Sequence, residues 1–203
     1  HSLEFKMLKK TYLLICLLLA PIVSNQVTTK AASPPTIRAA AAVLMEAKSG
    51  RVLYSKNPRQ IKPPASLTKI MTAILTLEET DLSANVRISN NAAGNRGSSM
   101  GLVRGERQRV EDLLYGLMLS SGNDAAVALA EQVAGTEGEF ARIMTAKARQ
   151  LGLKNTGFQN ASGLPAYGHY STAYDLALLA RYALNNRKFA EIVSTKEKTV
   201  PGP

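Results

Sequence analysis

Two short polar motifs in this chain carry the residue types that acyl-transfer chemistry needs. The first is Ser66-Leu67-Thr68-Lys69, which places a hydroxyl and an amine three residues apart just after Pro63-Pro64. Residues three apart on a helix are neighbours, and the proline pair favours a helix that starts near Ser66, where unpaired backbone N–H groups lie. A serine with an amine base beside it and amide donors behind it can act as an activated nucleophile.

Apolar residues recur at helical spacing from Leu67 to Leu77, which predicts an amphipathic helix over this stretch. At about 100° per residue, Ser66 projects into the middle of the apolar arc and Lys69 falls on its border. Burial disfavours a charged ammonium, so we expect a lowered pKa for Lys69 and a role as a neutral base. The alternative is an N-capping serine followed by a lysine whose charge reaches water.

The second motif is Ser121-Gly122-Asn123, a polar tripeptide between the apolar stretches 117–119 and 125–127. These flanks predict a short loop held by buried helices, which would present the Ser121 hydroxyl and the Asn123 amide rigidly. Taken alone, the tripeptide is better interpreted as a plain helix connection in which Asn123 caps the next helix. The presence of the first motif reverses that preference.

Several further elements must position these motifs. The apolar runs 40–45 and 51–55 flank a turn that ends at Gly50, and they predict a β-hairpin. The capping pair Thr172 and Asp175 marks the start of a late helix. Helical spacing recurs in four stretches, 110–119, 124–134, 137–151 and 172–186. Polar, glycine-rich loops are expected at 89–105 and 155–170, and Lys198-Thr199-Val200 is a candidate strand.

Composition indicates one globular domain of mixed structure, or one domain with a satellite lobe. The chain has 203 residues, of which 45% are hydrophobic and 5% aromatic, and it contains no tryptophan. The core is therefore expected to be aliphatic and rich in alanine. A two-stranded hairpin needs a further sheet partner to be stable, and the chain stops before it supplies one, so we expect it to be C-terminally truncated.

The first residues have the pattern of an export signal. Met7 is followed by Lys9-Lys10, an apolar run and a small-residue stretch that ends near residue 32. We expect residues 1–6 to be vector or upstream sequence, 7–32 to be a signal peptide, and 33–203 to be the functional domain. Cys16 lies within the leader, and Ile15 before it does not suit lipid attachment, so the exported chain would contain no thiol.

The charge and histidine content argue against several classes of protein. The net charge is +10, but the charges are scattered without a basic block, which makes nucleic acid a poor partner. Anionic wall polymer or lipid headgroups are better candidates, and an ordinary basic surface explains the charge equally well. The chain has two histidines, which makes a zinc site improbable. His169 lies in a glycine-flanked loop, where we expect a structural role rather than a place in a serine triad, and His169→Ala should leave acylation largely intact.

Together, the motifs resemble those of the serine D-alanyl-D-alanine carboxypeptidases, the low-molecular-mass penicillin-binding proteins, which share an acyl-serine fold with class A β-lactamases. The resemblance extends from about Ala39 to the last residue. It is carried by four stretches in the family's order, 64–72 (Pro-Ala-Ser-Leu-Thr-Lys-Ile-Met-Thr), 112–117 (Asp-Leu-Leu-Tyr-Gly-Leu), 121–126 (Ser-Gly-Asn-Asp-Ala-Ala) and 168–173 (Gly-His-Tyr-Ser-Thr-Ala).

The resemblance implies an α/β (α+β) fold of the β-lactamase/transpeptidase type, with an antiparallel sheet and a helical subdomain, and with the sheet incomplete. It implies that Ser66 is the nucleophile, Lys69 its base, Ser121 a proton relay to the departing amine, and Asn123 a hydrogen-bonding partner of the substrate peptide. The Ser66 backbone N–H would be one oxyanion donor. No cofactor or metal is implied.

The substrate implied is a peptidoglycan stem peptide ending in D-Ala-D-Ala, with β-lactam antibiotics as covalent inhibitors. The expected location is the outer face of the cytoplasmic membrane, the periplasm or the cell wall, and peripheral membrane association of the full-length parent fits the same resemblance. The family's third motif, Lys-Thr-Gly on a strand, is absent, because Lys198-Thr199 is followed by Val200. Since losing one oxyanion donor costs about 10²–10³ in rate, we expect the parent to be active and the 203-residue chain not to turn over.

Two alternatives remain at this point. A class A-like β-lactamase would use the same serine and lysine but needs a glutamate that activates the deacylating water. The stretch 151–170, where that residue would be sought, contains neither Asp nor Glu. The other alternative is a catalytically inactive fragment that binds the cell wall, which the missing third motif and the basic charge would suit.

Overall fold

The computed structural model describes residues 36–200. The expected upstream residues 1–6 and the expected signal peptide 7–32, including Cys16, lie outside this part. Residues 36–200 pack as one unit. Within the described range, no helix combines the length and the apolar character that crossing a bilayer requires.

Helices are the main regular structure of the described chain, and short strands accompany them, in agreement with the expected mixture of α and β structure. The strands are β1 (Ala42–Met45), β2 (Val52–Lys56), β3 (Asn85–Arg87) and β4 (Arg107–Arg109). The helices are the 3-10 helix η1 (Ala65–Thr68) and the α-helices α2 (Lys69–Glu79), α3 (Asn90–Ala93), α4 (Val110–Leu119), α5 (Asn123–Ala134), α6 (Glu137–Gln150), α7 (Ala173–Leu184) and α8 (Arg187–Ser194).

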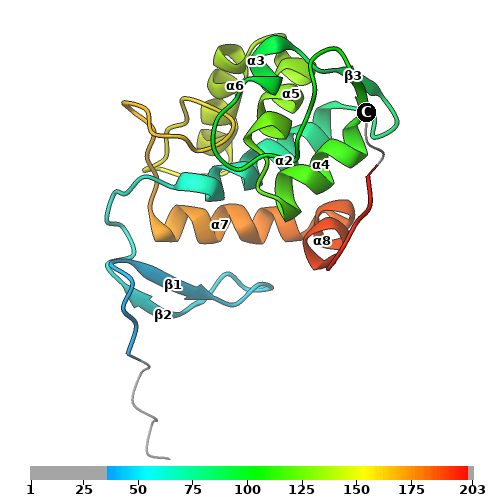
Figure 1. The fold of residues 1–203 in the computed structure, drawn as a ribbon. Coiled ribbons are helices and arrows are strands. Elements are labelled where there is room, and N and C mark those ends of the chain that lie inside the picture. The colour runs from blue at the N-terminus through cyan, green and yellow to red at the C-terminus, as the bar shows by residue number, and fades with distance from the viewer. Residues whose placement is uncertain (1–35, 201–203) are drawn as a thin grey trace, which may run out of the picture. The chain divides into compact units, whose positions relative to one another are not determined.

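The predicted hairpin is confirmed. Strands β1 and β2 pair antiparallel, with Ala42 opposite Lys56, and Gly50 supplies the positive φ of +74° that the turn needs. Helix α7 lies between this hairpin and the other helices (Figure 1). Arg181 of α7 fastens the turn by donating to the carbonyls of Ala47 and Lys48, each at 2.8 Å.

Helix α2 lies at the centre of the helical block and contacts α4, α5, α7 and α8 (Figure 1). Its middle is buried on all sides, which explains why Met71 through Leu75 contains no charged residue. The surrounding core is aliphatic and contains many alanines, as the composition predicts; it includes Ala125, Ala126, Ala128 and Ala130 of α5. This dense packing makes α2 a rigid support for the residues at its N-terminal end.

The predicted helix ends follow the expected local rules. The Thr172 side chain accepts the backbone N–H of Asp175 at 3.1 Å, so the capping pair at the start of α7 is confirmed. Helix α5 ends at Gly135, which has a φ of +77°.

Three features differ from the sequence prediction. Strands β3 and β4 form a second small antiparallel sheet that the prediction lacks. Helix α8 follows α7 directly, although no helix was expected after Asn186. The prediction of a strand at Lys198–Val200 is wrong, because these residues form neither helix nor strand. The second sheet escapes prediction because its strands are three residues long and mostly polar, without the apolar alternation that identifies longer strands.

Candidate active site

The two predicted hydroxyls meet in the structure. Ser66 lies on η1, and Ser121 lies in the connection between α4 and α5. Ser121 Oγ donates a hydrogen bond to Ser66 Oγ at 3.2 Å. Residues that are distant in sequence thus form one hydroxyl pair at the surface.

The first turn before α2 differs from the expected α-turn. Ser66 is exposed rather than buried in the apolar arc, whereas Lys69, expected on the border of that arc, is only 2% exposed. The turn is a 3-10 helix, in which residues i and i+3 eclipse one another, so angles counted for an α-helix do not hold before Lys69. The hydroxyl of Ser66 is therefore open to solvent while the amine three residues later is enclosed.

Both hydroxyl-bearing segments contain a residue in the left-handed region. Ala65, directly before the nucleophile candidate, has a φ of +48°, and Ser121 has a φ of +54°. Such a conformation costs roughly 1–3 kcal/mol for a non-glycine residue and persists only where surrounding contacts impose it. Strain of this kind clusters at functional sites, and here it occurs beside both hydroxyls.

Lys69 is held by two acceptors. Its Nζ donates to Asn123 Oδ1 and to the backbone carbonyl of Ser162, each at 2.8 Å. Burial lowers the pKa of Lys69 from 10.5 to about 8, although the negative charge of Asp124 acts in the opposite direction. The pKa is thus lowered as the sequence predicted, and roughly a tenth of the amine is neutral at pH 7.

The two acceptors also determine what the amine can do. A neutral amine has two N–H groups and one lone pair, so the two acceptors can take both N–H groups and leave the lone pair for a third neighbour. Ser66 stands one 3-10 turn away. Lys69 has no direct hydrogen bond to Ser66 within residues 36–200, and the contact that a base needs often tightens only when substrate is bound.

Asn123 is the first residue of α5 and is buried. Its Oδ1 accepts from Lys69, and its Nδ2 donates to the carbonyl of Arg96 at 2.6 Å. The alternative role of Asn123 as a helix cap is wrong, since Gly122 occupies the cap position and no side chain caps the helix. The amide instead joins Lys69 to the loop that contains Arg96.

Asp124 anchors the same loop, a role that the sequence prediction did not include. Its buried carboxylate accepts the Ser99 hydroxyl at 2.5 Å and the backbone N–H groups of Met100, Gly101 and Leu102 at 3.0–3.2 Å. Burial alone would raise the pKa of Asp124, but these hydrogen bonds hold it below its usual range. The sequence did contain a signal for this role, because Asp124 is a carboxylate directly after Ser121-Gly122-Asn123, at the start of a largely apolar, buried helix.

A second loop packs against the other side of the nucleophile turn. Besides the Ser162 carbonyl that binds Lys69, the carbonyl of Ala161 accepts the Thr72 hydroxyl at 2.7 Å. Gly163 has a φ of +90°, and a Cβ atom there would lie 1.9 Å from the carbonyl oxygen of Ala65. Only glycine allows this approach.

His169 belongs to this second loop and is buried. Its Nε2 lies 2.8 Å from Thr68 Oγ1, and its Nδ1 lies 3.1 Å from the backbone N of Gln159. Its ring nitrogens therefore contact neither Ser66 nor Ser121, in agreement with the prediction that it is no member of a serine triad. Its contact with Thr68, between Ser66 and Lys69, was not predicted.

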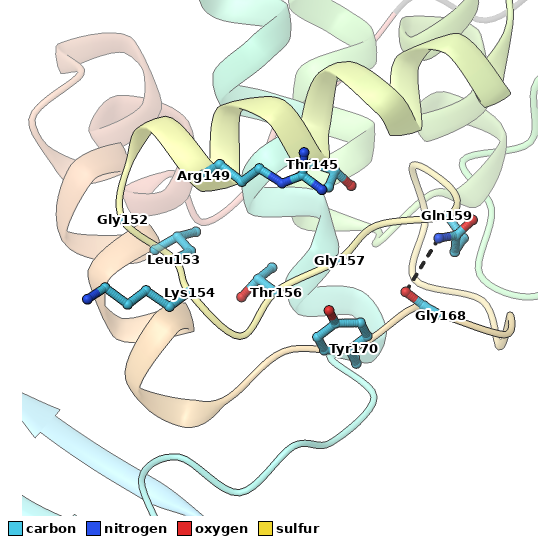
Figure 2. A pocket seen from close by; sticks show the side chains of 10 residues that line it. All are labelled: Thr145, Arg149, Gly152, Leu153, Lys154, Thr156, Gly157, Gln159, Gly168 and Tyr170. Carbon is cyan, nitrogen blue, oxygen red and sulfur yellow. Dashed lines mark hydrogen bonds between the residues drawn. The ribbon is translucent and has the colours of Figure 1, made fainter.

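A separate groove of about 610 Å³ lies behind this loop and contains neither Ser66 nor Ser121 in its lining. Figure 2 shows Thr145 and Arg149 on its α6 side and Thr156, Gly157 and Tyr170 on its loop side. No group of three His, Cys, Asp or Glu side chains that could hold a metal ion occurs among residues 36–200.

Comparison with known proteins agrees with this geometry. A family model described as D-alanyl-D-alanine carboxypeptidase matches residues 28–201. The chain is 45% identical over 164 residues to D-alanyl-D-alanine carboxypeptidase DacF of Bacillus subtilis, covering 78% of this chain and 42% of the relative. It is 36% identical to DacD of Salmonella typhimurium, covering 91% of this chain and 50% of the relative.

Solved structures share the fold. A D-alanyl-D-alanine carboxypeptidase from Mycobacterium tuberculosis matches with a TM-score of 0.82 at 32% identity, over 86% of this chain and 67% of that one. Penicillin binding protein 6B from Escherichia coli matches with a TM-score of 0.79 at 36% identity, over 86% of this chain and 59% of that one. This chain spans about half the length of the curated relatives it matches. It belongs to the D-alanyl-D-alanine carboxypeptidase family and has the fold of the penicillin-binding proteins.

Proposed function

We propose that this protein is a serine-type D-Ala-D-Ala carboxypeptidase that removes the terminal D-Ala from peptidoglycan stem peptides through an acyl-enzyme on Ser66. The observation that carries the proposal is the Ser121–Ser66 hydroxyl pair at 3.2 Å beside the buried Lys69. The names of the relatives and the family supply the substrate class. Peptidoglycan remodelling is the process in which such an activity takes part.

In the proposed acylation, neutral Lys69 takes the proton of Ser66 Oγ as that oxygen attacks the carbonyl carbon of the penultimate D-Ala. The backbone N–H of Ser66 donates to the developing oxyanion. When the tetrahedral intermediate collapses, the peptide C–N bond breaks, and Ser121 passes a proton from Lys69 to the departing D-Ala amine. Asn123 hydrogen-bonds the substrate peptide. Water then hydrolyses the ester, which releases the shortened peptide and restores the Ser66 hydroxyl.

Labelling with a fluorescent penicillin tests the proposal. We expect a covalent adduct that mass spectrometry locates on the peptide containing Ser66, and no adduct in Ser66→Ala. In Lys69→Met the labelling rate should fall by about 10²–10⁴, because general-base help of this kind contributes that much. A wild-type protein that folds but forms no adduct on Ser66 would overturn the proposal and would favour the non-catalytic wall-binding module.

The β-lactamase alternative predicts a different fate for the adduct. Deacylation in class A enzymes depends on a glutamate, and residues 151–170 contain neither Asp nor Glu. The carboxylate of Glu137 reaches this loop, but it accepts the backbone N–H of Ala161 at 3.1 Å. We therefore favour a long-lived penicilloyl adduct. Rapid hydrolysis of excess penicillin would support the β-lactamase instead.

The proposal includes export. The basic, apolar and small-residue order of residues 7–32 supports a location at the outer face of the cytoplasmic membrane, in the periplasm or in the cell wall. Beta-lactam antibiotics would then be covalent inhibitors, and peripheral membrane association is part of the same proposal. Cell fractionation followed by penicillin labelling tests the location, and label confined to the cytoplasm would contradict it.

A further inference from the structure

A buried hydrogen bond connects the nucleophile turn to a loop about a hundred residues later in the chain. Thr68 stands between Ser66 and Lys69 and is fully buried. Its hydroxyl lies 2.8 Å from His169 Nε2. The imidazole is itself buried and packs edge-on against Phe158, with ring centroids 5.7 Å apart.

The two partners of the imidazole define its protonation. The backbone N of Gln159 is a donor, so His169 Nδ1 must be the acceptor in that 3.1 Å contact. The ring proton is therefore assigned to Nε2, which donates to Thr68 Oγ1. Burial lowers the pKa of His169, which favours the neutral ring that this arrangement requires.

The turn that receives this hydrogen bond is one that needs external support. It is a 3-10 helix of only four residues, and its first hydrogen bond, from Leu67 N to the Pro64 carbonyl, is long at 3.2 Å. It begins at Ala65, whose φ of +48° is unfavourable for a residue with a side chain. Gly163 packs closely against the backbone carbonyl of Ala65, and the Ser162 carbonyl accepts a hydrogen bond from Lys69. His169 is the side chain that binds between these two points.

We propose that His169 is a positioning residue, whose hydrogen bond to Thr68 fixes the 3-10 turn and thereby holds Ser66 and Lys69 in the arrangement that acylation needs. The inference rests on the proposed function. It also replaces the expectation that His169→Ala leaves acylation largely intact. His169 touches no substrate; it acts through Thr68.

A matched pair of variants separates the two hydrogen bonds of the imidazole. His169→Gln places a side-chain N–H near the Nε2 position and can still donate to Thr68, whereas His169→Asn places its polar atoms near Nδ1 and cannot reach Thr68. We expect His169→Asn to lower the acylation rate constant at saturating penicillin about tenfold or more, because small misplacement of a nucleophile has large effects. His169→Gln should lose less than about threefold, because the hydrogen bond to Thr68 is kept.

Thr68→Val tests the same contact from the other side, because valine has the shape of threonine without its oxygen. We expect a decrease similar to that of His169→Asn. The double variant His169→Asn/Thr68→Val should show no further decrease, since both changes remove one hydrogen bond. Circular dichroism and melting temperature verify that each variant folds, and Thr68→Val alone still decides the question if His169→Asn does not fold.

The measurement resolves acylation into the penicillin dissociation constant and the acylation rate constant. Positioning predicts a change mainly in the rate constant, with recovery in His169→Gln. Wild-type acylation rates in His169→Asn or Thr68→Val would overturn the inference, and so would equal losses in His169→Gln and His169→Asn. A wild-type protein without any Ser66 adduct would instead contradict the proposed function.

Discussion

Two irregular segments converge on the residues around Lys69, and different chemistry holds each of them. The segment 157–171 is fixed mostly by uncharged contacts, namely the neutral imidazole of His169, backbone carbonyls and the close approach of Gly163 to Ala65, and its one carboxylate contact within residues 36–200 is that of Glu137 with the backbone N–H of Ala161. The segment 96–102 is fixed by the ionised carboxylate of Asp124, which gathers a hydroxyl and several backbone N–H groups. The first should therefore be sensitive to shape, and the second to charge.

Lys69 joins the two segments, because one of its acceptors comes from each side. The Ser162 carbonyl belongs to the first segment, and Asn123, which binds Arg96 of the second, supplies the other acceptor. The position and the pKa of one amine thus depend on both. This difference in chemistry leads to predictions that separate the two segments.

The largest effect is expected for Gly163→Ala in the first segment. The new methyl group would overlap the Ala65 carbonyl, and the alanine would have to adopt an unfavourable φ of +90°. We expect a loss of about 3 kcal/mol in the free energy of unfolding, measured with urea, and a strong decrease in penicillin labelling.

The second segment offers a matched control for this variant. Gly101 has nearly the same φ, +89°, but a Cβ atom there would meet nothing within 4 Å. Gly101→Ala should therefore cost only about 1 kcal/mol, from the backbone conformation alone. Equal losses in the two variants would show that close packing on Ala65 is unimportant.

Asp124→Asn should have the next largest effect. The amide offers one acceptor oxygen where the carboxylate offers two, so buried donors of the segment 96–102 lose their partner. We expect the free energy of unfolding to fall by about 2–3 kcal/mol and penicillin labelling at Ser66 to become slower. Asp81→Asn, at an exposed carboxylate that caps Ser83, is the control and should leave labelling unchanged. Labelling at the wild-type rate in Asp124→Asn would show that the position of the segment 96–102 does not affect acylation of Ser66.

The same carboxylate predicts how stability depends on pH. The pKa of Asp124 is lowered in the folded state relative to 3.8, so the unfolded chain binds the proton more readily. Its contribution to stability is present above about pH 3.8 and is lost as the pH falls through the folded value. Asp124→Asn should remove this part of the acid sensitivity in urea titrations from pH 6 to 3, whereas Asp81→Asn should change it less.

Lys69 gives a smaller effect that depends on both segments. Its pKa of about 8 means that the neutral fraction rises about tenfold per pH unit below that value and levels off above it. The acylation rate should follow this curve. Because the charge of Asp124 raises the pKa of Lys69, Asp124→Asn should move the midpoint to lower pH. A flat profile between pH 6 and 9 would exclude Lys69 as the base.

The sequence predicts the parts of this molecule that depend on local pattern. The helix 110–119 and the capping pair at Thr172 follow from spacing and capping within one turn, and the structure has each where it was expected. The motif residues Ser66 and Ser121 meet because α2, which follows Ser66, packs against α4 and α5, which flank Ser121.

The remaining features depend on residues far apart in the chain. Thr68 and His169 are 101 positions apart, and no local pattern indicates that one ring bridges the segment 157–171 to the nucleophile turn. The turn before Lys69 is a 3-10 helix against which that segment packs, and angles counted at about 100° per residue therefore placed Ser66 inside and Lys69 at the edge. In the sequence, Asp124 has the pattern of an ordinary acidic residue in the first turn of a helix. Its role in binding the segment 96–102 depends on the folded position of that segment.

The smallest effect is expected for a helix cap outside both segments. This variant tests whether a loss of stability alone lowers penicillin labelling. Thr136 caps α6 by accepting the backbone N–H of Glu139 at 3.1 Å. Thr136→Ala should lower the free energy of unfolding by about 1 kcal/mol and leave the acylation rate constant unchanged, because its hydrogen bond lies in neither segment. Urea unfolding and penicillin labelling on the same preparation measure both quantities. If labelling fell in proportion to this loss of stability, the decreases expected for Gly163→Ala and Asp124→Asn would reflect general destabilisation rather than positioning of Ser66 and Lys69.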